Sequence, residues 1–201
     1  MNALNRSPRT SSADLLRHLT RDAWAEVNRD LVAKALAEFA HELLIEPVPL
    51  GTEDGWSWYS LDTDHEHVKY RFRARRMQLD HWWLDRTSLR RLDCGSDTEL
   101  SAEGLVLDLH RRLALSADVL PEYLEELSSS LFAAAYKREQ ARLDATALAQ
   151  ASFQELESGM TEGHPIFVAN NARVGFNTLD YHDFAPETGA VTTLVWLAAR
   201  A

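Results

Sequence analysis

The residues best suited to bind a charged ligand are concentrated in one segment, residues 162–176, with the sequence EGHPIFVANNARVGF. His164 can hydrogen-bond a phosphate or act as an acid or a base near neutral pH. Arg173 carries a planar fork of donors that fits a carboxylate or a phosphate. Asn170 and Asn171 each add a donor and an acceptor. On chemistry alone, the segment is either an anion-binding edge or an ordinary His-Pro turn followed by an Asn-Asn bend.

Other residues that could carry chemistry form weaker patterns. His65 and His67 form an H-x-H pair at strand spacing, but no third ligand stands at a convincing spacing, so we predict no metal site. Cys94 is the single cysteine, which excludes an internal disulfide and fits a reducing compartment such as the cytoplasm. The sequence has neither a G-x-S-x-G elbow nor a Walker loop, so neither a hydrolase of that type nor a P-loop protein is supported.

A row of basic residues offers a second possible anion site. Lys69, Arg71, Arg73 and Arg75 alternate with apolar residues, so they should share one face of a strand. That face is either an anion-binding surface or a solvated sheet face whose charges pair across strands with partners such as Asp80. The alternation is compatible with both interpretations.

The charge of the chain argues against nucleic acid and its apolar content argues against a membrane. The net charge is −10 at pH 7, and residues 94–201 hold 7 basic and 16 acidic residues, so the surface repels a phosphate backbone. No run approaches the ~20 apolar residues that cross a membrane, and the polar N-terminus lacks the apolar core of a secretory signal. With 201 residues, 45% of them hydrophobic, the chain is long enough to bury its own core.

The apolar periodicity predicts an α+β fold in which a helical layer packs on an antiparallel sheet. Spacings of three and four residues predict a helix over 12–46, broken once near Asn28, and further helices over 101–115, 120–140 and 145–158. Alternation with a period of two predicts a meander of three strands, and short apolar runs near the C-terminus predict further strands. The predicted strands cover 56–61, 67–74 and 77–84 in the meander, and 166–169, 172–176 and 192–199 near the C-terminus.

A run of three serines, Ser128 to Ser130, is unusual inside the helix predicted over 120–140. Serine hydroxyls compete with the backbone hydrogen bonds of a helix and so disfavour its interior. The run is consistent with a helix surface that packs closely against another segment or that touches a ligand.

These elements divide the chain into three parts. Residues 1–11 are small and polar without periodicity, and we predict that they are disordered. Residues 12–160 form the domain of helices and antiparallel sheet, and residues 161–201 begin a second subdomain with its first strands. The apolar strand predicted over 192–199 would need neighbours on both sides, so we expect the second subdomain to be truncated in this sequence.

The segment MTEGHPIFVANNARVGFNTLDYHDFAPET resembles the N-terminal signature of the IucA/IucC family, the siderophore synthetases that work independently of peptide-synthetase templates. The form HP-x-FVANN-x-R-x-GF is similar to the subgroup that makes hydroxamates of the desferrioxamine and alcaligin type, and the similarity extends upstream to about Trp24. Where many members have a second His-Pro and a Lys, this chain has Phe167-Val168 and Asn171. The matching positions are Gly163-His164-Pro165, Arg173 with Gly175-Phe176, Asp180, and Phe184-Ala185-Pro186-Glu187.

The resemblance implies a thumb-like N-terminal lobe followed by the start of an ATP-binding subdomain in a longer, cupped chain. It implies a ligase that uses ATP and Mg²⁺ to join a carboxylate to AMP, releases pyrophosphate, and lets an amine or hydroxylamine attack the acyl-adenylate. The implied substrates are succinylated N-hydroxy-diamines or a citrate-type carboxylate, and the implied full-length form is a homodimer. His164 is the catalytic candidate, and the implied ATP- and substrate-binding residues are Thr161, Glu162, Gly163, His164, Asn170, Asn171 and Arg173.

Residues 1–201 alone are expected to be inactive, because residues 162–176 supply only one wall of a phosphate site. The alternative is that the chain is a non-catalytic lobe or fragment that acts as a scaffold or an oligomerisation module. A nucleic-acid-binding role for the arginine-rich strand is disfavoured by the acidic balance of the C-terminal half.

Overall fold

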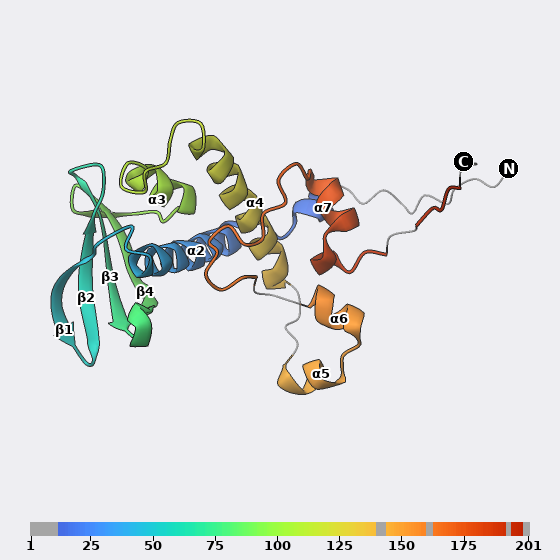
Figure 1. Ribbon diagram of the computed structural model, residues 1–201, viewed down its shortest axis with the longest axis horizontal. Coiled ribbons are helices and arrows are strands. Elements are labelled where there is room, and N and C mark those ends of the chain that lie inside the picture. The colour runs from blue at the N-terminus through green and yellow to red at the C-terminus, as the bar shows by residue number, and fades with distance from the viewer. Residues whose placement is uncertain (1–11, 140–143, 160–162, 192–193, 199–201) are drawn as a thin grey trace.

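A computed structural model describes residues 12–139, 144–159, 163–191 and 194–198 of the chain (Figure 1). It combines helices with one antiparallel sheet, which confirms the predicted α+β class. Among these residues, no helix combines the length and the apolar character needed to span a membrane. The helices are α1 (Ser12–Leu16), α2 (Arg21–His41), α3 (Ala102–Leu109), α4 (Leu120–Glu139), α5 (Ala145–Gln150), α6 (Phe153–Ser158) and α7 (Thr178–Phe184), with short 3-10 turns η1 (Gln78–Asp80) and η2 (Pro186–Thr188).

The sheet is a meander in which every strand pairs with the strand next to it in the chain, in the order β1-β2-β3-β4-β5. All four pairings are antiparallel. The strands are β1 (Val48–Glu53), β2 (Trp56–Asp62), β3 (Val68–Arg76), β4 (Trp82–Asp93) and β5 (Ser96–Thr98).

The hydrophobic core lies between the inner face of the sheet and the helices. Val68, Tyr70, Phe72 and Ala74 alternate along β3 and are all buried, as the two-residue period predicts. They share one core cluster with residues of α2, α3 and α4, including Leu36 of α2. Figure 1 shows α2 running from the sheet to α4, so this helix connects the sheet to the helical part of the molecule.

A buried polar cluster fixes α3 against the sheet. The Tyr70 hydroxyl donates to Oδ2 of Asp108 at 2.8 Å, and the Arg91 guanidinium donates to both oxygens of Asp108 at 2.8 and 3.1 Å. Burial, reinforced by the charge of Asp108, raises the pKa of Tyr70, and the hydrogen bond to Asp108 raises the pKa of Arg91. The carboxylate therefore joins α3, β3 and β4 with its charge compensated.

The basic row lies on the outer face of the sheet and is packed against tryptophans. The Arg71 guanidinium lies 5.0 Å from the ring centroid of Trp58, and that of Arg75 lies 4.4 Å from the ring centroid of Trp56. These contacts favour the interpretation of the row as a sheet face with partners of its own. The other two members of the row form ion pairs, Arg73 with Asp85 and Lys69 with Asp62. Asp80, the partner suggested by the sequence, pairs with Arg76, which lies outside the row.

The long N-terminal helix breaks between α1 and α2, not near Asn28 as predicted. Thr20 caps α2 by accepting a hydrogen bond from the N–H of Ala23 at 3.2 Å. Asn28 is buried: its amide donates to the carbonyl of Trp24 at 3.0 Å and accepts from the N–H of Ala102 at 2.8 Å. The asparagine thus satisfies a backbone donor at the start of α3 and ties α3 to α2.

The strand predicted over 77–84 is wrong for residues 77–81, which form the turn between β3 and β4, whereas residues 82–84 begin β4. Leu79 and Asp80 have positive φ values of 58° and 57°, which no strand accommodates. The outer strands β1 and β5 escaped prediction because all of their residues are exposed and show no alternation of burial. The helix predicted over 120–140 is confirmed by α4, and the one predicted over 145–158 is divided into α5 and α6.

No strand forms among the described residues of the C-terminal part, so the strands predicted over 166–169 and 172–176 are wrong. Residues 194–198 also lie outside any helix or strand, and the rest of the strand predicted over 192–199 falls outside the described residues. Helix α7 occupies a stretch predicted to be a loop. The predicted disorder of residues 1–11 concerns residues that the structure does not describe.

Candidate functional site

The predicted binding segment forms a turn-rich loop, residues 163–176, that we call the site loop. It is hydrogen-bonded to side chains of both α2 and α4, and its buried Val168 belongs to the main core. The Lys34 amino group donates to the carbonyl oxygens of His164 at 2.9 Å and Phe167 at 2.8 Å. A side chain of α2 therefore satisfies backbone acceptors that a strand would have placed in a sheet.

The serine run of α4 holds the other side of the site loop. Ser129 Oγ accepts a hydrogen bond from the N–H of Arg173 at 2.7 Å, and Ser130 Oγ accepts one from the N–H of Asn171 at 3.4 Å. The hydroxyl of Ser128 instead donates a hydrogen bond to the carboxylate of Glu103 in α3 at 2.8 Å. Of the two interpretations of the run, the structure supports a helix surface that packs closely against another segment.

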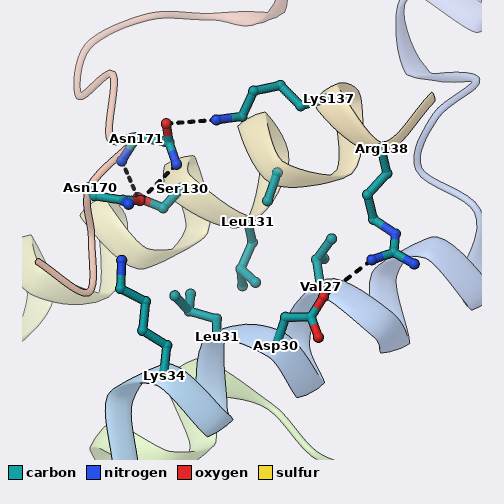
Figure 2. A pocket seen from close by; sticks show the side chains of 11 residues that line it. Val27, Asp30, Leu31, Lys34, Ser130, Leu131, Lys137, Arg138, Asn170 and Asn171 are labelled. Carbon is teal, nitrogen blue, oxygen red and sulfur yellow. Dashed lines mark hydrogen bonds and ion pairs between the residues drawn. The ribbon is translucent and has the colours of Figure 1, made fainter. Parts of the chain in front are cut away.

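A pocket of about 200 Å³ lies between α2, α4 and the site loop, and we call it the lysine pocket. Apolar side chains of the two helices form its walls. As Figure 2 shows, the amino group of Lys137 points toward Asn171, and that of Lys34 points toward the same end of the pocket. The polar residues around this end are Lys34, Ser130, Lys137, Asn170 and Asn171.

A chain of hydrogen bonds orients the two amides of the site loop. Lys137 Nζ donates to Asn171 Oδ1 at 2.8 Å, Asn171 Nδ2 donates to Asn170 Oδ1 at 2.7 Å, and Asn170 Nδ2 donates to the carbonyl of His164 at 3.0 Å. The close fit requires Gly163, because a Cβ there would lie 2.7 Å from Asn170 Nδ2. Lys137 itself is buried, so its ammonium adds positive charge where solvent screening is weak.

The opposite end of the lysine pocket carries one carboxylate with two cationic partners. Asp30 accepts hydrogen bonds from Arg138 at 3.1 Å and from Arg86. Both guanidinium groups also lie near Glu26, at 3.7 Å for Arg138 and 3.6 Å for Arg86. The hydrogen bond to Asp30 raises the pKa of Arg86. Asp30 is thus already compensated by the two guanidinium groups.

His164 is exposed and has a defined orientation. Its Nδ1 accepts a hydrogen bond from the N–H of Ile166 at 3.3 Å. An accepting Nδ1 places the proton of the neutral ring on Nε2. In this orientation the neutral imidazole carries a donor at Nε2.

Arg173 is turned away from the lysine pocket and toward a buried carboxylate. Its guanidinium donates to Glu187 Oε2 at 3.0 Å, and the Tyr181 hydroxyl donates to Glu187 Oε1 at 2.8 Å. Burial, with the charge of Glu187, raises the pKa of Tyr181. A second cavity of about 350 Å³ borders Arg173 and the serine run, and it shares no described lining residue with the lysine pocket.

The structure therefore brings together His164, Asn170 and Asn171 with Gly163 and separates Arg173 from them. Thr161 and Glu162 lie outside the described residues. Sequence analysis did not identify Lys34 and Lys137, which border the same pocket. A signal was present: Val27, Leu31 and Lys34 on α2, and Ser130, Ala134 and Lys137 on α4, each follow the i, i+4, i+7 spacing of one helix face.

Metal-binding residues do not gather in the part of the chain that the structure describes. No group of three His, Cys, Asp or Glu residues there could hold an ion. The H-x-H pair keeps its two rings 6.1 Å apart, and His67 lies 3.8 Å from Asp93. Cys94 is exposed in the turn between β4 and β5.

Comparison with known proteins gives one consistent result. The sequence profile described as "IucA / IucC family" matches residues 152–201. Putrebactin synthase of Shewanella sp. (strain MR-4) is 43% identical over 183 residues, which cover 91% of this chain and 29% of that protein. The chain thus spans less than a third of the length of this relative.

Solved structures agree with the sequence comparison. Aerobactin synthetase IucC from a hypervirulent pathotype of Klebsiella pneumoniae superposes with a TM-score of 0.70 at 27% identity, over 84% of this chain and 29% of that one. The petrobactin biosynthesis protein AsbB of Bacillus anthracis str. Sterne gives a TM-score of 0.73 over 89% of this chain and 30% of that one. At 19% identity, the second match shows a shared fold.

Proposed function

The chain carries the sequence and the fold of part of the IucA / IucC siderophore synthetases, and we propose that it is the N-terminal portion of an ATP-dependent ligase that builds a hydroxamate siderophore. One observation carries the proposal: 43% identity to putrebactin synthase over 91% of the chain. Such similarity extends well beyond the segment that the family profile matches.

The proposed reaction has two steps. A substrate carboxylate attacks the α-phosphorus of ATP, which forms an acyl-adenylate and releases pyrophosphate. An amine or hydroxylamine nitrogen then attacks the acyl carbon, which forms the amide or hydroxamate bond and releases AMP and the proton of the nucleophile. We propose a succinylated N-hydroxy-diamine as the substrate, with a citrate-type carboxylate as the other candidate.

The site loop would contribute to binding in this reaction. We propose that the exposed His164, with its donor at Nε2, and the amides of Asn170 and Asn171 face the substrates, and that Thr161 and Glu162 take part beside them. Since the guanidinium of Arg173 is bound to Glu187, its role in this state is to fix the C-terminal half of the site loop. Charge on a reacting phosphate or carboxylate would be stabilised by groups held in place before the reaction.

ATP and Mg²⁺ are the proposed cofactors. The lysine pocket, at about 200 Å³, is below the ~300 Å³ at which sites for drug-sized ligands begin, so a nucleotide would require further surface. Carboxylate ligands for Mg²⁺ do not cluster among the described residues, so we assign no Mg²⁺ ligand here and derive no step through the ion. We place the reaction in the cytoplasm, in a homodimer.

A pyrophosphate-release assay tests the proposal. The complete encoded protein, supplied with ATP, Mg²⁺ and N-hydroxy-N-succinyl-diamines, should release pyrophosphate in a substrate-dependent manner, and residues 1–201 assayed in parallel should not. Omission of the diamine substrate is the control for ATP hydrolysis. Absence of substrate-dependent release by the complete protein would reject the ligase and leave the scaffold or oligomerisation module as the remaining candidate.

A further inference from the structure

We propose that Lys34 and Lys137 are positioning residues for His164. They fix the turn from which the imidazole is presented, and they act through His164 and not on a substrate. The orientation of His164 rests on the contacts of the site loop alone, whereas its consequence for turnover rests on the proposed function.

The carbonyl oxygen of His164 is the point at which both lysines converge. Lys34 Nζ donates to this oxygen at 2.9 Å, and Asn170 Nδ2 donates to it at 3.0 Å. Asn170 is also the last member of the series of hydrogen bonds that begins at Lys137 and runs through Asn171. The protein has three lysines, and two of them, from α2 and α4, therefore hold one backbone oxygen of an exposed histidine.

Lys137 sets the direction of that series of hydrogen bonds. An ammonium group donates but cannot accept, so Asn171 must turn its side-chain oxygen toward Lys137. The nitrogen of Asn171 is then left to donate to Asn170 (Figure 2), whose own nitrogen is left to donate to His164. With an apolar residue at position 137 either amide could flip. Asn170 would then face the carbonyl of His164 with an oxygen, which repels it.

The turn around His164 depends on these polar contacts, because apolar packing does not hold it. Ile166 and Phe167 expose 44% and 58% of their surface. Pro165 has no N–H with which to donate a backbone hydrogen bond inside the turn. Lys34 closes the turn instead, since the amino group that binds the carbonyl of His164 also donates to that of Phe167 at 2.8 Å.

The closed turn in its place orients the ring. The N–H of Ile166 donates to Nδ1 of His164 at 3.3 Å, and this contact requires the backbone of residues 164–166 to keep its bend. With Nδ1 accepting, the proton of the neutral ring stays on Nε2. A donor that is held in place before the substrates arrive needs no reorganisation during the reaction, and that is the advantage the two lysines supply.

NMR spectroscopy of the histidine rings in residues 1–201 tests the orientation without any activity. Long-range ¹H–¹⁵N spectra are recorded at about pH 8.5, where an imidazole is neutral, and the His164 signals are identified by their loss in His164→Gln. The wild type should show the Nε2–H tautomer. Lys34→Met and Lys137→Met should shift the signals toward the tautomer mixture of a free histidine. Lys69→Met is the matched control, since Lys69 is exposed and paired with Asp62 at 2.9 Å, and it should keep the wild-type signals.

Gly163→Ala keeps the test decisive if Lys137→Met does not fold. This variant retains both lysines, but a Cβ at residue 163 would lie 2.7 Å from Asn170 Nδ2 and would displace that amide from the carbonyl of His164. The same shift of the His164 signals is therefore expected. Wild-type His164 signals in folded Lys34→Met or in folded Gly163→Ala would overturn the proposal.

A double-mutant cycle in the complete protein tests whether Lys137 acts through His164. Lys137→Met and His164→Gln should each lower the kcat/KM of pyrophosphate release by about tenfold to a hundredfold, because a misplacement of about 1 Å can cost this much. The combined variant should lose no more than the larger of the two single losses, since an imidazole that is absent cannot be misplaced. Losses that multiply would overturn the positioning role.

The two proposals can fail separately. Shifted His164 signals in the lysine variants, together with a complete protein that shows no substrate-dependent pyrophosphate release, would retain the positioning and reject the ligase. Substrate-dependent release by the complete protein, together with wild-type His164 signals in the lysine variants, would retain the ligase and reject the positioning.

Discussion

Glu187 shows how a motif residue can serve the fold. It is buried and accepts hydrogen bonds from Arg173 and Tyr181. Its position in the chain, directly after Pro186, makes it part of the same signature as Arg173. From the sequence, Arg173 is predicted to bind a ligand. The sequence does not separate a ligand from an internal partner, because a guanidinium fork is equally suited to an internal and an external carboxylate. Only the structure identifies the internal partner.

Arg173→Ala should destabilise the protein by about 1.5–3 kcal/mol, because it leaves the buried Glu187 carboxylate without its cation. Urea unfolding of residues 1–201 measures the loss. Adding Glu187→Gln to Arg173→Ala should recover part of it, since a neutral amide needs no counter-charge. A stability of Arg173→Ala equal to that of the wild type would mean that the ion pair contributes nothing to the fold.

His18 is predicted to make the stability depend on pH. It is buried edge-on against Phe132 and Tyr136, with ring centroids 4.7 and 5.4 Å away, and its Nε2 has no hydrogen-bond partner in the described structure. Burial lowers the pKa of His18, against the opposing effect of Glu139. The unfolded state therefore binds the proton more tightly, and the contribution of His18 is complete above about pH 6.5 and lost as pH falls through the lower folded pKa.

Urea unfolding at several pH values between about 5 and 7.5 measures this contribution. One proton allows a slope of at most about 1.4 kcal/mol per pH unit. His18→Leu should flatten the curve, whereas His65→Leu, at an exposed position, should keep the wild-type slope. Parallel curves for the wild type and His18→Leu would contradict the assignment.

At the scale of elements, prediction succeeded where burial alternates along a strand or helix. Strands β2 and β3 and helix α4 follow from such patterns, because one face of each must be apolar. The edge strands carry no such pattern. Helix α7 did have a sequence signal: Asn177 and Asp180 form a capping box, but the acidic and turn-forming residues around them favoured a loop.

The sequence predicts that the site loop is a binding segment, but it does not predict the backbone conformation of the loop. Its apolar run, residues 166–169, is equally compatible with a strand and with a short buried turn, and periodicity does not separate the two. In the structure Val168 and Ala169 are buried while Ile166 and Phe167 are exposed. The partners of the loop come from far away in the chain: Lys34 lies 130 residues before His164. No local pattern contains that information.

Asn28→Ala should cost about 1–3 kcal/mol of stability, because it leaves the N–H of Ala102 buried without an acceptor at the start of α3. Thr20→Ala removes an exposed cap of α2 and should cost about 1 kcal/mol or less. Urea unfolding compares the two. An equal loss in both variants would show that the link between α2 and α3 adds nothing beyond ordinary capping.

At the scale of the whole molecule, the apolar surface is unevenly distributed. Leu194, Val195, Trp196 and Leu197 expose between 70% and 93% of their surface. Consecutive exposed apolar side chains of this kind are typical of a contact with another protein surface. The buried apolar residues of the described chain lie in one main core and one small cluster around Tyr181.

Residues 1–201 should therefore self-associate through residues 194–197. Sedimentation velocity at increasing protein concentration should show a growing fraction of larger species. The double variant Trp196→Glu with Leu197→Glu should abolish this growth, because a charge in an apolar contact is poorly solvated. Trp83→Glu, at an exposed tryptophan of the sheet, is the control. Association that persists in the double variant would place the contact elsewhere.

The order of the strands has a consequence for how the chain is made on the ribosome. Because every strand pairs with the one before it, the whole meander can close through short connections, and such local pairing favours rapid folding. Helix α2, the sheet and α3 are therefore expected to assemble on the nascent chain while α4 and the site loop have yet to be synthesised. The lysine pocket needs α2, α4 and the site loop at once, so it forms only after the site loop has been synthesised. A nascent chain that stalls before residue 163 would display a folded sheet and no pocket.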